Sequence, residues 1–136
     1  MNKASFSLTN YKFEKVLIET ANLPADISID FSPEGVYYKE KSEYDLKFVV
    51  TAFDEKKGQE LPFVQITCVA NFKFMEVNSL EEIPTYFYKN SIAIVFPFIR
   101  AFISSVTLQC NIQPIILPTL NLSSLELPLK QNTKTQ

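Results

Sequence analysis

The chain has 136 residues, a formal net charge of −2 and a pI near 5.2, a size that suits one domain. The chain has no excess of basic residues, which argues against nucleic-acid binding, because proteins hold nucleic acid mainly with clustered Lys and Arg. With no His, two Cys and two Gly, the chain cannot build Ser-His or Cys-His catalytic pairs, His-containing zinc sites or glycine-rich phosphate loops. Its carboxylates lie among turn residues or lysines, as solvated charges do. We therefore expect no enzymatic activity and no metal, nucleotide or covalent cofactor.

Neither an export signal nor a membrane helix is expected from the sequence. The first residues lack the apolar run of a signal peptide. The longest apolar stretch, residues 92–106, contains Arg100 and is shorter than the roughly 20 residues that a membrane helix needs. Cys68 and Cys110 lie far apart, which is typical of buried free thiols in a reducing compartment. These features predict a cytoplasmic protein.

The first half of the chain predicts an antiparallel sheet. Apolar residues alternate with polar ones over 6–19, as one long strand or two, and again over 27–31. Ser32-Pro33-Glu34-Gly35 then suits a type I turn. A clear alternation over 44–52 leads through the charged loop 54–58 to a return strand over 62–75, with Gly58 supplying a positive φ. Three or four strands follow from these patterns.

The pattern changes to a helical one after the return strand. Residues 78–82 resemble a helix start, and Asn90 or Ser91 could cap a second helix that continues to about Gln109. Pro97 lies inside this segment, so the helix either bends there or begins there. Strands followed by helices make the fold class α+β.

The end of the chain is apolar and then polar. Residues 112–122 are rich in Ile, Leu and Pro and nearly free of charge, which predicts an extended strap lying on other apolar surface. Residues 130–136 are polar, and we expect a disordered tail there after a single domain over 1–129.

Two short motifs resemble the SecB-type protein-export chaperones. Phe96, Pro97, Arg100 and Ser105 match the Phe-Pro-x-x-Arg core and the Ser-containing step of the long helix in that family. The segment Pro118-Thr119-Leu120-Asn121-Leu122 matches the family's Pro-x-Leu-Asn-Leu segment, and the resemblance extends over about 60–136. Without it, the helix would be an ordinary core helix with Arg100 paired to a strand carboxylate, and the strap a plain cover.

The resemblance implies a four-stranded antiparallel sheet with helices behind it, assembled as a dimer of dimers. Proteins of this family bind unfolded preproteins in long apolar grooves, without catalysis, and pass them to an export motor. It places Val64, Ile66 and Cys68 at the interface with the neighbouring dimer. Glu19 matches an acidic residue on which the motor docks, whereas Lys15 and Gln65 replace two others, so the acidic docking surface is incomplete.

A further departure lies at the family's final helix, where residues 123–128 stop at Pro128 and leave at most one turn. Phe98, Ile99, Phe102 and Ile103 already offer an apolar face to one side of the sheet. The other face of the sheet and the strap must then pack against each other, against another subunit or against a client polypeptide. The candidate client-binding residues are Ile27, Ile29, Phe31, Tyr44, Phe48, Phe72, Phe74, Ile115, Ile116, Leu120 and Leu122.

The sequence therefore predicts a homotetrameric holdase, a chaperone that binds unfolded or partly folded polypeptides. An oligomeric adaptor with the same fold that binds one dedicated partner, such as a toxin-linked protein, is the alternative. An enzyme of a kind without a visible motif is the third class.

Overall fold

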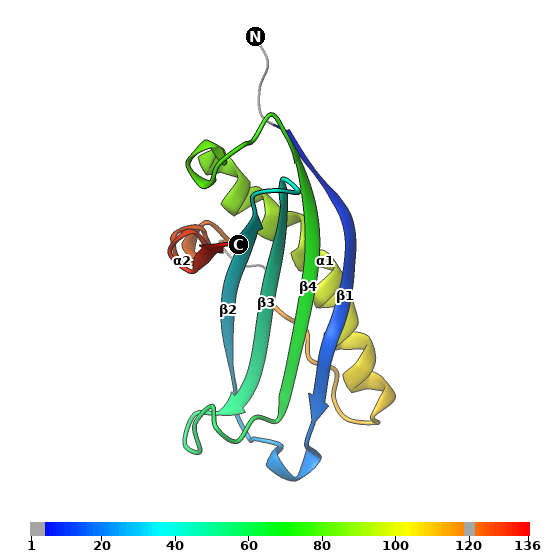
Figure 1. Ribbon diagram of the computed structural model, residues 1–136. Coiled ribbons are helices and arrows are strands. Elements are labelled where there is room, and N and C mark those ends of the chain that lie inside the picture. Colours follow the sequence, from blue (N-terminus) through cyan, green and yellow to red (C-terminus); the bar gives the residue numbers. More distant parts are fainter. Residues whose placement is uncertain (1–4, 119–121) are drawn as a thin grey trace.

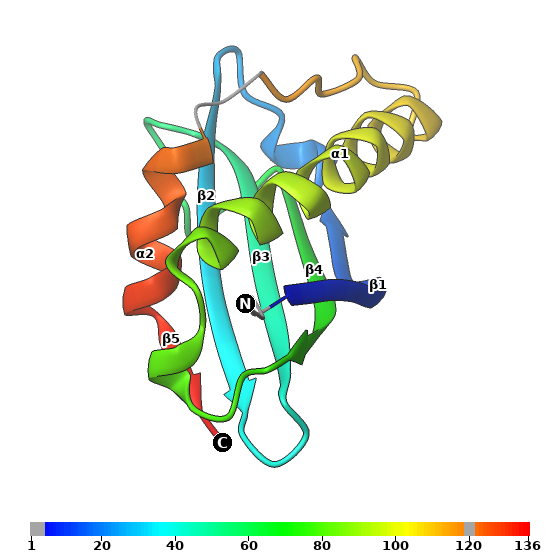
Figure 2. The same ribbon diagram turned by 90° about the horizontal axis from the view of Figure 1, so that it is seen from above.

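A long helix crosses one face of a five-stranded sheet in the computed structural model, which describes residues 5–118 and 122–136 (Figures 1 and 2). The predicted α+β class and the long helix on one face are confirmed. The strands are β1 (Ser5–Ile18), β2 (Ile27–Tyr38), β3 (Glu43–Asp54), β4 (Val64–Met75) and β5 (Thr133–Thr135).

The sheet is mixed, with the strand order β1-β4-β3-β2-β5. The first four strands pair antiparallel, whereas β5 pairs parallel to β2 over Gly35–Tyr37. A four-stranded antiparallel sheet with a disordered tail over 130–136 was therefore the wrong expectation. The sequence Thr-Lys-Thr has no apolar alternation, and main-chain hydrogen bonds to β2 order it instead.

The first strand is continuous but irregular. Its register against β4 shifts between Leu8 and Asn10 and again between Phe13 and Lys15. Each bulge changes which residues face the helix, so Phe6 and Phe13 both lie on the helix side. The short 3-10 helix η1 (Thr20–Asn22) lies in the connection from β1 to β2, and two strands, β4 and β3, separate β1 from β2 in the sheet.

The turn predicted over residues 32–35 does not form, and β2 runs straight through it. The backbone nitrogen of Pro33 faces away from β3, as that of Gly35 does, so the missing amide hydrogen costs no hydrogen bond to β3. Gly35 is needed because the Tyr44 side chain passes directly against it, and a Cβ atom there would overlap the tyrosine ring and hydroxyl. Pro33 and Gly35, residue types that are common in turns, therefore lie inside a continuous strand.

The long helix α1 (Thr85–Gln109) is a single element that begins before the predicted start at Asn90 or Ser91. Pro97 lies inside it on the exposed side. The predicted earlier helix is the 3-10 turn η2 (Leu80–Glu82). By length and composition α1 could cross a membrane, but its buried residues pack on the sheet, as in the core helix of a globular domain.

The strap and a short helical segment follow α1. Residues 113–118 run without helix or strand, and η3 (Leu122–Leu125) leads directly into α2 (Glu126–Gln131) beside β2 (Figure 1). This segment is longer than the single turn expected from Pro128. Pro128 lies in the first turn of α2, where the amide hydrogen that it lacks would have no helical partner.

Candidate functional site

Four aromatic residues assigned to the client groove lie instead in the core. Tyr44, Phe48, Phe72 and Phe74 are at most 3% exposed. Phe87 of α1 packs among them, with ring centroids 4.8 Å from Tyr44 and from Phe74. The assignment fails because α1 covers this face of the sheet, and strand periodicity does not tell which face a helix covers.

The predicted oligomer interface is buried for the same reason. Val64, Ile66 and Cys68 share the helix-facing side of β4 with Phe72, and none of them has exposed surface. Burial raises the pKa of the Cys68 thiol from 9.0 to about 11, so this thiol stays protonated at neutral pH. Cys110, by contrast, is exposed after the end of α1, against the expectation of two buried thiols. A second subunit cannot contact Val64, Ile66 or Cys68 in the folded chain.

The remaining aliphatic candidates come together at one hollow. Ile27 and Ile29 of β2 face Ile115 and Ile116 of the strap across a space of about 490 Å³. Ile27 is 42% and Ile116 69% exposed, which is unusual for isoleucine. Asp26 is the one charged residue among the described residues that line this hollow. We call this space the strap groove.

Of the other predicted groove residues, Phe31 and Leu122 are described by the structure and do not line the strap groove. Phe31 is half-buried and packs on Phe48 and Phe96, with ring centroids 6.0 and 5.9 Å away. Leu122 is half-buried against the core at the start of η3. Leu120 lies outside the described residues.

The strap is held in place by the buried hydroxyl of Thr107. This oxygen accepts a hydrogen bond from the backbone N–H of Ile115 at 2.9 Å and donates to the carbonyl of Ile103 at 2.7 Å. Ile115 and Leu117 are buried in the core, and Ile116 between them points outward. The strap therefore presents Ile116 from a fixed backbone.

The opposite wall of the strap groove was not predicted. Leu23, Pro24 and Ala25 form it, in the crossover between β1 and β2. Leu23 is 53% exposed, while the crossover is fixed by the hydrogen bond from the Asn22 side chain to the Pro62 carbonyl at 3.3 Å. The available sequence signal for this wall is an apolar Leu next to a chain-breaking Pro.

The SecB-like helix motif lines a second hollow of about 420 Å³ on α1. Pro97 and Arg100 lie there with Ala101 and Ile116, so Ile116 borders both hollows. Phe96 is buried beneath, and Ser105 is exposed. Arg100 is exposed as well. The alternative interpretation, in which Arg100 is buried against a strand carboxylate, is therefore wrong.

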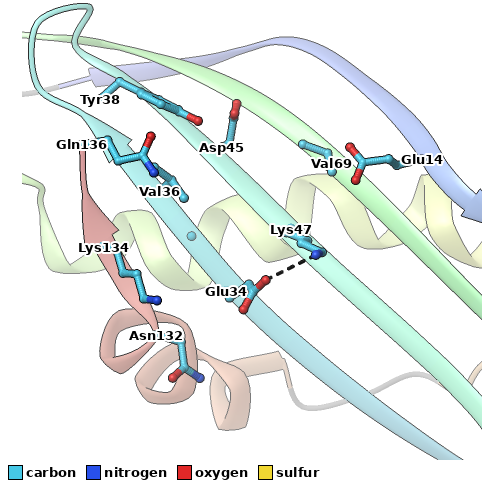
Figure 3. Close-up of a pocket in the computed structure, with 11 residues that line it drawn as sticks. Glu14, Glu34, Val36, Tyr38, Asp45, Lys47, Val69, Asn132, Lys134 and Gln136 are labelled. Atoms are coloured by element: carbon cyan, nitrogen blue, oxygen red, sulfur yellow. Dashed lines mark ion pairs between the residues drawn. The ribbon is translucent and has the colours of Figure 1, made fainter.

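The outer face of the sheet, away from α1, has a different character (Figure 3). A depression of about 340 Å³ is lined by charges of both signs, including Glu14, Asp45 and Lys134. Lys47 and Glu34 form an ion pair across it at 3.6 Å, with both side chains about half exposed. Exposed pairs of this kind contribute little to stability. Val36, Tyr38 and Val69 add apolar surface between these charges.

The predicted motor-docking residue has a structural contact. The Glu19 carboxylate accepts the backbone N–H of Ala21 at 3.2 Å and caps η1. At the two departures from the family pattern, Lys15 Nζ donates to Gln65 Oε1 at 2.7 Å. At these two positions, where the resemblance implied acidic residues, the sheet carries a Lys–Gln hydrogen bond.

Comparisons with known proteins identify the fold of the chain. No family model matches the chain. The uncharacterized protein MJ0357 of Methanocaldococcus jannaschii is 27% identical over 146 aligned positions that cover 98% of this chain and 93% of that protein. Among solved structures, the Mycobacterium tuberculosis Rv1957 SecB-like chaperone, in complex with a ChAD peptide from the Rv1956 HigA1 antitoxin, superposes with a TM-score of 0.67. That match is 13% identical and covers 85% of this chain and 91% of the other. The chain therefore has a SecB-like fold.

Proposed function

We propose that this protein is a holdase that binds unfolded or partly folded polypeptides in the strap groove, without catalysis. The observation that carries the proposal is the group of exposed apolar residues, Leu23, Ile27 and Ile116, around one hollow of a SecB-like fold. Isolated exposed apolar residues are ordinary, but a contiguous set around a concavity is typical of an interaction site.

The energetics suit weak and unselective holding. Burial of about 200 Å² of apolar surface stabilises a complex by about 5 kcal/mol before the loss of translational and conformational freedom is subtracted. One groove therefore holds a client loosely. Several grooves on one assembly would add by effective concentration, and folding of the client would remove its exposed apolar segments.

The proposal is tested by replacing Ile27 and Ile116 together with Ser. Both side chains are exposed, so the melting temperature should change little, while suppression of aggregation of several unrelated unfolded proteins should fall. Met75→Ser is the matched control, because Met75 is 66% exposed at the end of β4 and lines neither hollow. Equal activity of the double variant and the control would contradict the strap groove as the client site.

A dedicated adaptor is the second candidate, favoured by the peptide of one antitoxin that is bound to the SecB-like chaperone Rv1957. An adaptor would co-purify with one partner at fixed stoichiometry and would not suppress aggregation of unrelated proteins. The same Ile27→Ser and Ile116→Ser double variant should then lose that one partner.

We also propose self-association through α1. The side of α1 away from the sheet carries Ala93, Ile94, Pro97, Ala101 and Leu108, all exposed and uncharged. At 100° per residue these positions form one stripe along the helix. Small side chains at four-residue spacing allow two helices to approach closely, so a second copy can cover this stripe. This surface replaces Val64, Ile66 and Cys68 as the proposed interface.

A further inference from the structure

The free edge of β2 already accepts one added strand. Gly35 donates its N–H to the Asn132 carbonyl at 3.1 Å, the Tyr37 carbonyl accepts from Gln136 at 2.8 Å, and Lys39 donates to the Gln136 carbonyl at 3.0 Å. Every main-chain group that β2 offers to β5 thus comes from an odd-numbered residue. Within a strand, alternate residues direct their N–H and C=O groups to the same side.

The other half of this edge is open. The register of β2 against β3 is unbroken from Ile27 to Tyr38, so Ile27, Ile29 and Phe31 direct their main-chain groups to the same side as Gly35. Pro33 has no amide hydrogen and separates the two halves. Among residues 5–118 and 122–136, no backbone hydrogen bond reaches Ile27, Ile29 or Phe31 from that side. Unpaired groups along a strand edge are a template for another strand.

The strap groove lies beside this open half. Its lining contains Ile27 and Ile29 from the edge itself, and Ile115 and Ile116 from the strap. Within the described part of the strap, no backbone hydrogen bond reaches β2, and Ile115 gives its N–H to Thr107 on α1. A space of about 490 Å³ therefore separates an unpaired strand edge from an apolar wall.

We propose that the bound polypeptide adds to β2 as an extra strand along Ile27–Phe31. Its main chain pairs with Ile27, Ile29 and Phe31, and every second side chain enters the strap groove. This inference rests on the proposed function and specifies its ligand: an extended segment with alternating β-branched residues. The carboxylate of Asp26 in the lining disfavours acidic segments and favours neutral or basic ones. Main-chain pairing also explains how one site could hold unrelated sequences.

The test uses a fluorescein-labelled peptide of alternating Val and Thr with lysines at both ends, titrated with the whole protein. Two derivatives carry N-methyl groups on all Val amides or on all Thr amides. Only one set of amides can face β2, so one derivative should bind about tenfold or more weakly, since each lost hydrogen bond is worth about 1 kcal/mol. The other should bind within about twofold of the parent peptide. Equal affinities of the two derivatives would overturn strand addition while leaving the groove intact.

Variants of the protein give an independent readout. Ile29→Pro removes one outward N–H, as Pro33 does naturally, whereas Ile29→Val keeps the N–H and a similar side chain. We expect about tenfold weaker peptide binding for Ile29→Pro and nearly unchanged binding for Ile29→Val. If Ile29→Pro does not fold, the methylated peptides decide alone.

Amide hydrogen exchange distinguishes the remaining outcomes. The Ile29 and Phe31 amides should exchange fast in the free protein and slowly with the peptide bound. Unchanged exchange with the peptide bound overturns the inference. Slow exchange without peptide would show that the edge is already occupied, for instance by a second copy, and also overturns it. Failure of the unmodified peptide to bind contradicts the proposed function itself, together with strand addition.

Discussion

Gly35 and Tyr44 show how one residue without a side chain allows a distant contact. The Tyr44 ring passes against Gly35 and reaches β5, where its hydroxyl lies 2.6 Å from Thr133 Oγ1. Thr133 Oγ1 in turn donates to the Leu129 carbonyl at 2.7 Å, so the Tyr44 hydroxyl is the donor to Thr133. A side chain of β3 is thus linked by hydrogen bonds to both β5 and α2.

Gly35→Ala should destabilise the protein by about 1–3 kcal/mol, because the new methyl group overlaps a fully buried ring. Gly58→Ala is the matched control: Gly58 has a φ of 83°, but no atom of the described residues lies within 4 Å of an added Cβ, so only backbone strain of about 1 kcal/mol is expected. Urea unfolding measures both. In a Tyr44→Leu background the cost of Gly35→Ala should shrink, and an unchanged cost would contradict the steric explanation.

The buried thiol of Cys68 predicts a loss of stability in alkali. Its pKa is raised from 9.0 to about 11 in the folded chain, so the unfolded chain loses this proton first as the pH rises. The contribution is therefore fully present below pH 9 and disappears between about pH 9 and 11. Melting temperatures should fall less over this range for Cys68→Ala/Cys110→Ser than for Cys110→Ser. Equal slopes would contradict the assignment to Cys68, since the buried tyrosines are common to both variants.

At the scale of elements, the alternation of apolar and polar residues predicted the four long strands. It did not predict which face of the sheet is covered by α1. The alternation from Tyr44 to Ala52 correctly indicated which residues of β3 share a face. It could not indicate that α1 covers this face, so aromatic residues of the core were assigned to the groove. The short strand β5 left no signal, because its stability comes from main-chain hydrogen bonds and from the Tyr44 hydroxyl.

The strap groove was predicted in part for the same physical reason. Its aliphatic residues on β2 and the strap were visible as an apolar surplus, of which Ile116 is the clearest case. The crossover wall at Leu23 depends on the route of the chain between β1 and β2, and no local pattern encodes that route. Thr107, which fixes the strap, is invisible in sequence because a threonine inside an apolar helix has no distinguishing spacing.

Thr107→Val should loosen the strap. The substitution keeps the shape but leaves the buried Ile115 N–H without its acceptor, at a cost of about 1–3 kcal/mol. Thr107→Ser keeps the hydroxyl and is the matched control. The Ile115 amide should exchange faster in Thr107→Val than in Thr107→Ser, and polypeptide binding should weaken in parallel. Equal exchange in the two variants would show that the hydroxyl does not hold the strap.

At the scale of the whole molecule, α1 is covered by the sheet on one side and carries an uncharged stripe on the other. We expect light scattering to give an oligomer at micromolar concentration. Ala101→Arg should convert it to smaller species, because a charge then lies in the middle of the stripe, while the circular dichroism of the subunit stays unchanged. Leu127→Arg, at an exposed position on α2, should leave the assembly intact. A monomeric parent protein would contradict this proposal.

The strand order also dictates when the sheet can be completed. β1 is synthesised before the other strands of the sheet, yet its only strand partner in the described sheet is β4, with Ser5 opposite Met75. The hairpins β2–β3 and β3–β4 involve nearby residues and can close early, whereas β1 must wait for a loop of the intervening chain to close. During this interval Phe6, Leu8 and Phe13 have no helix or strand to cover them. Until β4 has been synthesised, a new copy therefore exposes a segment with alternating apolar residues, the kind of ligand that we propose for the strap groove of a mature copy.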